Sequence, residues 1–406
     1  MIDVAIVGAG AAGIGAARRL ADRGRSVLLV EALGRLGGRA HTIMARGMPL
    51  DLGCGWLHSA ERNPWVDIAE AEGVAIDRTP SAWQVQFRSL GFSASDQHAA
   101  HEAFAAWDGR LRSHPMANDR AADLLDPACP WNAYIEALSS YINGAQLAEL
   151  SIADYLAYDE AASETNWRLP GGYGALVAGA VRGVEIALDT PVRAIEDAPH
   201  GVRLLTDRGT IAARATIVTV PTDVLASGAI RLPARFDAMA AAAAALPLGL
   251  ADKLFLAIAE PEAVPPDSHL LGNPHSASTG SYYLRPFGRP VIECFFGGAA
   301  ARALEAEGVA AAEAFAREEL GGLLGTGFAG GLTAIAGSAW AREPFIRGSY
   351  SHALPGHAAA RATLAEPIDP RILIAGEACS PCDFSTAHGA YQTGVAAADQ
   401  LDRSFR

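Results

Sequence analysis

The stretch from residue 2 to residue 31 limits the possible folds of this chain more than any other segment. An apolar, β-branched run at 4–7 predicts a buried parallel strand, residues 11–22 follow a helical pattern, and 26–30 predict a second strand. Between the first strand and the helix stand Gly8, Gly10 and Gly13, with the spacing G-x-G-x-x-G. The complete unit predicts a parallel α/β domain that binds a dinucleotide.

Each glycine of the turn has a mechanical reason. Gly8 permits the tight turn, Gly10 lets the backbone approach a pyrophosphate, and Gly13 lets the helix pack closely on the strand. The first helical turn, with Ala11 and Ala12, presents unpaired N–H groups and a partial positive charge to the phosphates. Glycine-rich turns also occur for packing alone, so the prediction rests on the whole unit.

The residues after the second strand indicate which dinucleotide fits. Glu31, followed by Ala32, stands where a carboxylate accepts hydrogen bonds from ribose hydroxyls. A 2′-phosphate would be repelled there, so NADP is disfavoured and NAD or FAD remains.

Length, charge and cysteine content exclude some classes of protein. With 406 residues, half of them hydrophobic, the chain can form two domains. A net charge of −13 argues against nucleic-acid binding and is compatible with cationic small molecules. The first strand leaves no room for a signal peptide, and the longest apolar stretch, 238–251, is too short to span a bilayer. Five cysteines fit a reduced compartment, so we expect a cytoplasmic protein without a membrane segment.

The segment after the dinucleotide unit favours FAD. Residues 36–42 read L-G-G-R-A-H-T and resemble the G-G-R-x-x-T extension of the flavin amine oxidase superfamily, which includes monoamine and polyamine oxidases. The resemblance implies that Gly37, Gly38 and Arg39 wrap the pyrophosphate and the flavin side of FAD. The alternative interpretation is a surface loop with a solvated Arg39.

A second motif, D-L-G-C-G-W-L-H at 51–58, resembles the polyamine-oxidase branch of that family. There the segment lines the flavin, which implies cofactor contacts from Gly53, Gly55, Trp56 and Leu57. The same resemblance places His58 at the substrate channel, although a structural histidine is the rival interpretation.

Further positions match family segments that contact FAD. The strand 372–375 with Gly376 and Glu377 resembles F-A-G-E, and 386–394 resembles T-x-H-G-A-x-x-S-G, whose helix N-terminus points at the flavin pyrimidine. The cofactor contacts implied here are Val192 (through its backbone), Trp340, Gly376, Glu377, Thr386 and Ala387.

Lys253 is the sharpest candidate for chemistry. It is a charge inside an apolar strand, where an unpaired ammonium is costly. Its surroundings resemble the family's P-x-G-x-x-x-K, whose lysine holds a water against flavin N5 and assists reoxidation by oxygen. The alternative is a solvent-facing lysine paired with Asp252.

Tyr350 resembles the tyrosine that forms one wall of the family's aromatic cage, and the opposite wall corresponds to Thr386. The cage is therefore incomplete, which puts a simple aromatic monoamine in doubt. Small residues at this position also occur in relatives that oxidise polyamines or peptide lysines. Ser349 replaces the cysteine that links flavin covalently in monoamine oxidases, so we expect non-covalent FAD.

The expected fold is a Rossmann-type α/β FAD-binding domain of the amine oxidase type with an interleaved α+β substrate domain. We expect the FAD domain at 1–80, 165–246 and 340–406, and the substrate domain at 81–164 and 247–339. Within the latter, 145–158 and 299–320 each read as a helix. Cys379 and Cys382 have C-x-x-C spacing and are either a redox pair or two unconnected residues. No metal site is expected.

The resemblance implies an FAD-dependent amine oxidase. Hydride passes from the carbon next to an amine nitrogen to flavin N5, the imine is hydrolysed, and O₂ reoxidises the flavin to give H₂O₂. Alternatives are a desaturase or dehydrogenase with another electron acceptor, and an FAD-holding interaction protein without turnover. A histone-demethylase-like role is disfavoured by the acidic balance and the lack of a long coiled-coil insertion. The particular amine and the oligomeric state stay open.

Overall fold

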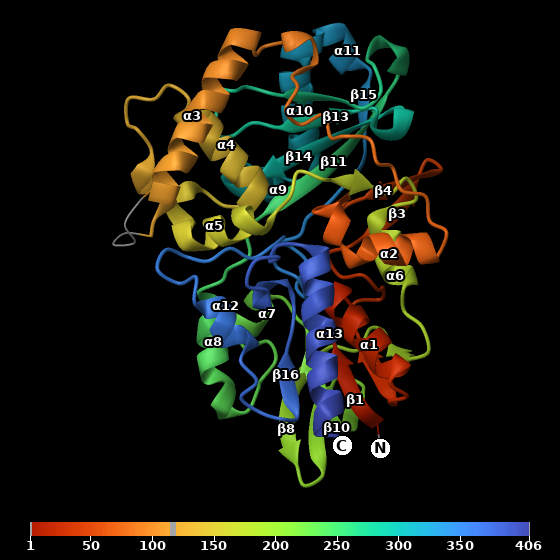
Figure 1. The fold of residues 1–406 in the computed structure, drawn as a ribbon. Coiled ribbons are helices and arrows are strands. Elements are labelled where there is room, and N and C mark those ends of the chain that lie inside the picture. The colour runs from red at the N-terminus through yellow and green to blue at the C-terminus, as the bar shows by residue number, and fades with distance from the viewer. Residues whose placement is uncertain (1, 114–118, 406) are drawn as a thin grey trace.

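The computed structural model describes residues 2–113 and 119–405. Figure 1 shows two sheets, one in the lower half of the molecule and one in the upper half, with most helices packed around them. The first strand and the end of the last helix lie together at the bottom of this view.

The lower sheet has seven strands and is built from three separate parts of the chain. The order is β7-β2-β1-β10-β9-β8, with β16 paired to β10, and β1 runs parallel to both β2 and β10. Its strands are β1 (Ile2–Val7), β2 (Val27–Val30), β7 (Glu185–Ala187), β8 (Val192–Ala198), β9 (Gly201–Thr206), β10 (Gly209–Val218) and β16 (Ile372–Ile374). All of these strands fall within the segments expected for the FAD domain.

Helices cover both faces of this sheet, which explains the unbroken apolar run of β1. Val4 and Ile6 pack with α1 (Ala11–Asp22) and α13 (Ala387–Ser404), while Ala5 and Val7 face the opposite core. That second core is completed by α7 (Thr222–Ala226), α8 (Asp237–Ala244) and α12 (Ala360–Ala365).

The first and last helices lie side by side in Figure 1 and approach each other closely. A Cβ on Gly394 would stand 1.9 Å from the carbonyl oxygen of Ala12, and one on Gly15 would stand 2.7 Å from that of Tyr391. Glycine at both positions therefore sets the distance between the two helices.

The upper sheet is antiparallel and has five strands in the order β12-β13-β14-β11-β15. They are β11 (Ala251–Ile258), β12 (Ser268–Leu271), β13 (Ser281–Leu284), β14 (Val291–Gly297) and β15 (Leu332–Gly337). Around the sheet stand α3 (Ala94–Ser113), α4 (Asn132–Asn143), α5 (Ile152–Ala161), α9 (Gly298–Glu307), α10 (Val309–Leu324) and α11 (Thr326–Gly330). The residues of β12 and β15 carried no strand prediction from the sequence.

Smaller elements join the two halves. They are the hairpin β3 (Thr42–Ala45) and β4 (Met48–Asp51), the pair β5 (Trp56–Leu57) and β6 (Trp167–Arg168), and helices α2 (Pro64–Ala71) and α6 (Tyr173–Gly179). Short 3-10 turns are η1 (Ala60–Arg62), η2 (Phe87–Ser89), η3 (Ala121–Leu124), η4 (Leu147–Glu149), η5 (Ala234–Phe236), η6 (Pro261–Ala263), η7 (Pro286–Gly288) and η8 (Glu377–Cys379).

Two helices expected as continuous are interrupted. The helix expected at 299–320 divides into α9 and α10 at Gly308, whose φ of +97° is a backbone conformation that glycine adopts readily. The helix expected at 145–158 divides into η4 and α5, because Ser151 takes an extended backbone and its Oγ accepts the N–H of Asp154 at 3.2 Å.

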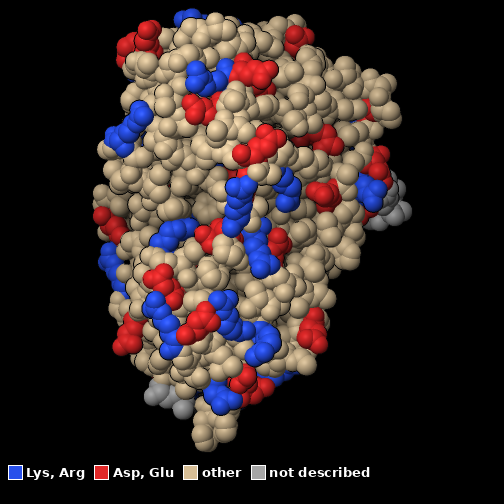
Figure 2. All heavy atoms as spheres, turned by 180° about the vertical axis from the view of Figure 1, so that it is seen from behind, with Lys and Arg blue, Asp and Glu red and all other residues tan. Residues whose placement is uncertain are grey.

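Charged side chains of both signs are interspersed on the face drawn in Figure 2. Among the helices of residues 2–113 and 119–405, none combines the length and the apolar character needed to cross a bilayer.

Candidate functional site

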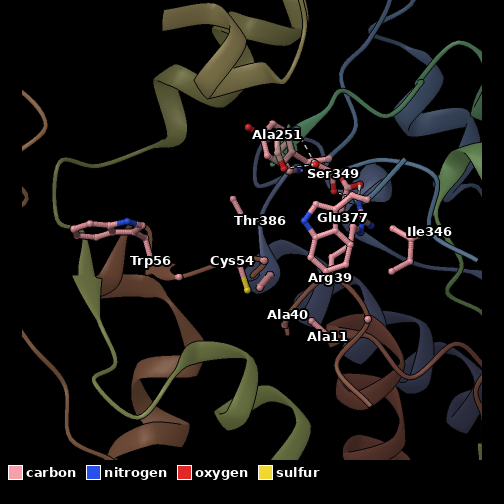
Figure 3. Close-up of a pocket in the computed structure, with 18 of the residues that line it drawn as sticks. Ala11, Arg39, Ala40, Cys54, Trp56, Ala251, Ile346, Ser349, Glu377 and Thr386 are labelled. Atoms are coloured by element: carbon pink, nitrogen blue, oxygen red, sulfur yellow. Dashed lines mark hydrogen bonds and ion pairs between the residues drawn. The ribbon is translucent and has the colours of Figure 1, made fainter. Parts of the chain in front are cut away.

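A cavity of about 1220 Å³ is lined by residues from both sheets. Pockets for drug-sized ligands usually measure roughly 300–1,000 Å³, so this one has room for a dinucleotide and a further small molecule. Figure 3 shows part of it, with Arg39, Ser349 and Glu377 gathered on one side and Trp56 on the other.

The glycine turn forms one end of the cavity and has the geometry that the sequence predicted. Gly8 has a φ of +102°, and a Cβ on Gly13 would stand 1.9 Å from the carbonyl oxygen of Gly8. In contrast, a Cβ on Gly10 would meet nothing closer than the carbonyl oxygen of Gly37 at 4.0 Å. No side chain of the described residues caps the N-terminus of α1. Open space and uncapped N–H groups fit a pyrophosphate.

Glu31 stands directly after β2, as expected, and lines this end of the cavity with Ala32 and Val192. Its side chain is buried, and its carboxylate accepts the backbone N–H groups of Ala9 at 2.6 Å and Leu33 at 2.8 Å. Burial raises the pKa of Glu31. The carboxylate therefore fixes the turn, and its contact with a ribose stays a prediction.

The G-G-R segment wraps the same end. Gly37 and Gly38 have φ values of +95° and +58°, and the Gly37 N–H donates to the carbonyl oxygen of Ala9 at 2.8 Å. The Arg39 guanidinium donates to the carbonyl oxygen of Ser349 at 2.7 Å and to Oε1 of Glu377 at 2.9 Å. The solvated-arginine interpretation is therefore wrong.

Glu377 is buried beside these groups and accepts from the hydroxyl of Ser351 at 2.7 Å and the N–H of Ser385 at 2.9 Å. Burial alone would raise the pKa of Glu377, but the positive charges of Arg39 and Arg361 and these hydrogen bonds outweigh it and lower the pKa. Glu377 is thus a carboxylate at neutral pH and holds Arg39 in place. Gly376, next to it, also lines the cavity.

Lys253 reaches the cavity from β11, and its side chain is only 7 % exposed. Its Nζ lies 2.7 Å from Oε1 of Glu293 on the neighbouring strand β14. Burial would lower the pKa of Lys253, but the charges of Glu293 and Asp51 raise it. Asp252 is directed elsewhere and accepts from the hydroxyl of Ser338 at 2.7 Å. The interpretation of Lys253 as a solvent-facing partner of Asp252 is therefore wrong.

The 51–58 turn brings backbone against these cations. A Cβ on Gly55 would stand 3.1 Å from Nζ of Lys253, and one on Gly53 would stand 1.7 Å from the carbonyl oxygen of Arg39. Trp340 is buried beside Gly53 and lines the cavity. Only glycine fits at position 53, while position 55 leaves little space beside the ammonium.

The 51–58 turn ends on the side of the cavity opposite Arg39. Trp56 packs edge-on against Trp83, with ring centroids 4.3 Å apart, and Figure 3 shows it across the cavity from Arg39. Leu57 is buried in the core, so its side chain does not line the cavity. His58 bonds to Oδ1 of Asn166 at 2.7 Å, and burial lowers its pKa to about 4. The imidazole is therefore neutral at neutral pH.

Three hydroxyl groups that line the cavity already have partners. The Ser349 hydroxyl donates to the carbonyl oxygen of Ala251 at 2.8 Å, and the Tyr350 hydroxyl donates to that of Tyr141 at 2.5 Å. Thr386 caps α13 by accepting the N–H of Gly389 at 3.0 Å. Tyr350, Thr386 and Ala387, the first residue of α13, all line the cavity.

Sequence reasoning missed Glu293 and Asp51, which set the electrostatics around Lys253. Glu293 carried a signal, because it is a lone charge in the apolar run V-I-E-C-F-F, as Lys253 is in its own strand. Asp51 lies at the end of β4 and accepts the N–H groups of Tyr173 and Gly174 at 2.9 and 3.1 Å, a contact that pairs distant segments. Sequence alone could not have shown that contact.

The two C-x-x-C cysteines lie outside the main cavity, and both are free thiols. Cys379 is buried, which raises its pKa to about 12, and Cys382 is partly exposed. Whether they form a redox pair stays open.

Comparisons with known proteins agree with this geometry. Residues 95–402 match the family described as "Flavin containing amine oxidoreductase", and residues 6–70 match the "NAD(P)-binding Rossmann-like domain". "Polyamine oxidase 2" of Arabidopsis thaliana is 28% identical over an alignment of 435 residues with gaps. The alignment covers 98% of this chain and 87% of that protein. "Polyamine oxidase 4" of Oryza sativa subsp. japonica is 27% identical, with 98% and 88% covered.

Among solved structures, wild-type putrescine oxidase bound to putrescine superposes with a TM-score of 0.79 at 19% identity. The match covers 100% of this chain and 99% of that chain. At this identity the superposition shows a shared fold. The resemblance to the polyamine-oxidase branch that the sequence motifs indicated is confirmed by the sequence relatives.

Proposed function

We propose that this chain oxidises amines beside Lys253. It belongs to the flavin-containing amine oxidoreductase family and is an FAD-dependent enzyme that acts on amines. Bound FAD would supply the two-electron acceptor for hydride from the carbon next to the amine nitrogen, with O₂ as the final acceptor and H₂O₂ as its product. The observation that carries the proposal is a single cavity that joins the glycine turn to a buried, charged lysine.

We assign the cofactor's binding to the residues around the glycine turn. Uncapped N–H groups of α1 would hold the pyrophosphate, Glu31 would meet a ribose, and the Arg39–Glu377 pair would fix the central part of FAD. Ser349 has no thiol to form a flavin bond, and its hydroxyl is engaged by Ala251, which supports non-covalent binding.

Lys253 assists the half-reaction in which O₂ reoxidises the flavin. The raised pKa keeps its ammonium charged at neutral pH, and the ion pair with Glu293 fixes its position. A fixed positive charge in a site shielded from water stabilises negative charge that develops on oxygen, directly or through a bound water. Gly55 leaves the ammonium open to the cavity.

Oxidation of the amine requires that the substrate is held in position, and it does not require a strong base. An unprotonated amine drives hydride loss with its own lone pair, and the product imine is hydrolysed by water. Tyr350 and Thr386 present their side chains as walls, since both hydroxyl groups are already bonded. His58, which is neutral, also lines the cavity and can accept or donate a hydrogen bond there without adding charge.

A dehydrogenase with another electron acceptor, or an FAD-holding protein without turnover, would share the same fold. Anaerobic mixing with a panel of amines, followed by mixing with O₂, separates the three. An oxidase bleaches with an amine and recovers its colour rapidly in O₂. A dehydrogenase bleaches and recovers slowly, and a non-catalytic protein does not bleach. A cytoplasmic location stays a prediction.

A further inference from the structure

The substrate side of the cavity is a chamber whose floor is one face of the upper sheet. Strand residues alternate between the two faces, and the members that line the cavity are two apart on each strand. They are Ala251 and Lys253 on β11, His269 and Leu271 on β12, Ser281 and Tyr283 on β13, and Glu293 and Phe295 on β14. The intervening residues face the core formed with α9 and α10.

Three helices form the opposite wall of this chamber, each through one stripe. The spacing of the lining residues on each helix matches the helical repeat. On α3 they include Gln97, His101 and Phe104, and on α4 they include Tyr134, Leu138 and Tyr141. On α5 they are Tyr155, Tyr158 and Asp159. Aromatic rings thus face the sheet from all three helices.

The few acidic residues on this side are paired or exposed. Glu293 pairs with Lys253, and Asp159 pairs with Arg112 at an exposed position. Glu164 is exposed. Among the described lining residues, the interior therefore presents aromatic rings, leucines, neutral polar groups and the paired cations Lys253 and Arg168, and no buried carboxylate free to receive a second ammonium.

Several polar side chains in the interior have partners within the protein, whereas the buried hydroxyl of Tyr283 has none among the described residues. The Gln86 amide bonds to the backbone of Leu90 and Leu271, and Gln97 donates to the carbonyl oxygen of Phe92 at 2.7 Å. His269 bonds to Ser281 at 2.8 Å, and burial lowers its pKa to about 4. These groups therefore add no fixed charge to the chamber.

We propose that the substrate is an amine carrying a bulky uncharged aromatic or apolar group, and that this group occupies the chamber between the upper sheet and helices α3, α4 and α5. A second ammonium there would lose its hydration without gaining a carboxylate partner, and cation–π contacts return only part of that loss. An aromatic group instead buries a large apolar area against rings. The proposal rests on the proposed amine oxidation, and it departs from the doubt about an aromatic monoamine that Thr386 raised in the sequence.

The test compares two amines of equal spacer length, 4-phenylbutylamine and 1,4-diaminobutane, with the FAD-loaded enzyme under anaerobic conditions. The perturbation of the flavin spectrum gives each Kd, and bleaching gives the rate of reduction. We expect a Kd lower by about tenfold or more for 4-phenylbutylamine. Equal or tighter binding of 1,4-diaminobutane overturns the chamber proposal. Binding of 4-phenylbutylamine without bleaching by any amine overturns the amine oxidation instead.

A charge placed in the chamber sharpens the test. Leu138→Glu adds a carboxylate to the α4 stripe, so the preference shifts toward 1,4-diaminobutane by about tenfold. Ala133→Glu, on the same helix but outside the cavity lining, leaves the ratio unchanged. An unchanged ratio in FAD-bound Leu138→Glu contradicts the proposal. If that variant retains no FAD, Phe104→Ala is tested instead. This variant must weaken the binding of 4-phenylbutylamine and leave the binding of 1,4-diaminobutane unchanged.

Discussion

Asp252 and Lys253 are adjacent in sequence but face opposite sides of the upper sheet. Asp252 bonds to Ser338, with its other carboxylate oxygen buried, whereas Lys253 enters the cavity and pairs with Glu293 at 2.7 Å. The alternation of side chains along β11 produces this separation. It gives the site a fixed ammonium whose partner comes from another strand.

Removing that cation tests its role with oxygen. We expect Lys253→Met to retain FAD and to be reduced by amine at a near-normal rate, while reoxidation slows about 100-fold, because a charge directed at the reacting oxygen is lost. Stopped-flow measurement of the two half-reactions separates these effects. An unchanged reoxidation rate would remove Lys253 from the mechanism.

Glu293→Gln tests the electrostatic support of the lysine. Glu293 raises the pKa of Lys253, so its neutralisation lowers that pKa toward the value that burial dictates. We expect the alkaline limit of reoxidation to move to lower pH, with FAD retained. The pH profile of the reoxidation rate measures the shift, and a shift to higher pH contradicts the assignment.

Ser349 predicts how FAD leaves the protein. Since position 349 carries a hydroxyl bonded to Ala251 rather than a thiol, acid precipitation should release all yellow colour into the supernatant. Colour that stays with the pellet would indicate a covalent attachment elsewhere.

The Arg39–Glu377 pair contributes to stability as well as to cofactor binding. Arg39→Met leaves a buried carboxylate without this partner, and we expect the free energy of unfolding to fall by about 3 kcal/mol. Arg193→Met removes an exposed partner of Asp207, where solvent screens the interaction, and should lower the free energy of unfolding much less. Chemical denaturation measures both, and equal losses would contradict the assignment.

The same carboxylate predicts a pH dependence. The pKa of Glu377 is lower in the folded protein than its ordinary value of 4.5, so its contribution is present above that value and is lost as the pH falls through the folded pKa. Glu377→Gln should therefore flatten the acid limb of the stability profile. A variant with an unchanged acid limb would show that other groups dominate there.

Gly13 predicts a steric requirement. A Cβ at this position would stand 1.9 Å from the carbonyl oxygen of Gly8, so Gly13→Ala must displace α1 from β1 and abolish FAD binding. Gly109→Ala, where a Cβ on α3 meets nothing within 4 Å, should retain FAD and increase helix stability slightly. Absorbance at the flavin bands reports both results.

Local patterns predicted the parts of the site that local geometry controls. The span of α1, the glycine turn and the place of Glu31 follow from period and spacing within thirty residues. The partners of Arg39 and Lys253 were not predictable, because Glu377 and Glu293 join them only through the packing of distant segments. The break at Gly308 was missed because one glycine in an alanine-rich helical pattern gives no certain sign of its φ.

The contact between α1 and α13 ties the order of synthesis to cofactor capture. The final eighteen-residue helix seals the flank of the first one, and β16 completes the sheet only after residue 371. A nascent chain therefore cannot complete the nucleotide pocket before α13 has been synthesised, and truncation before β16 should yield a product without flavin colour.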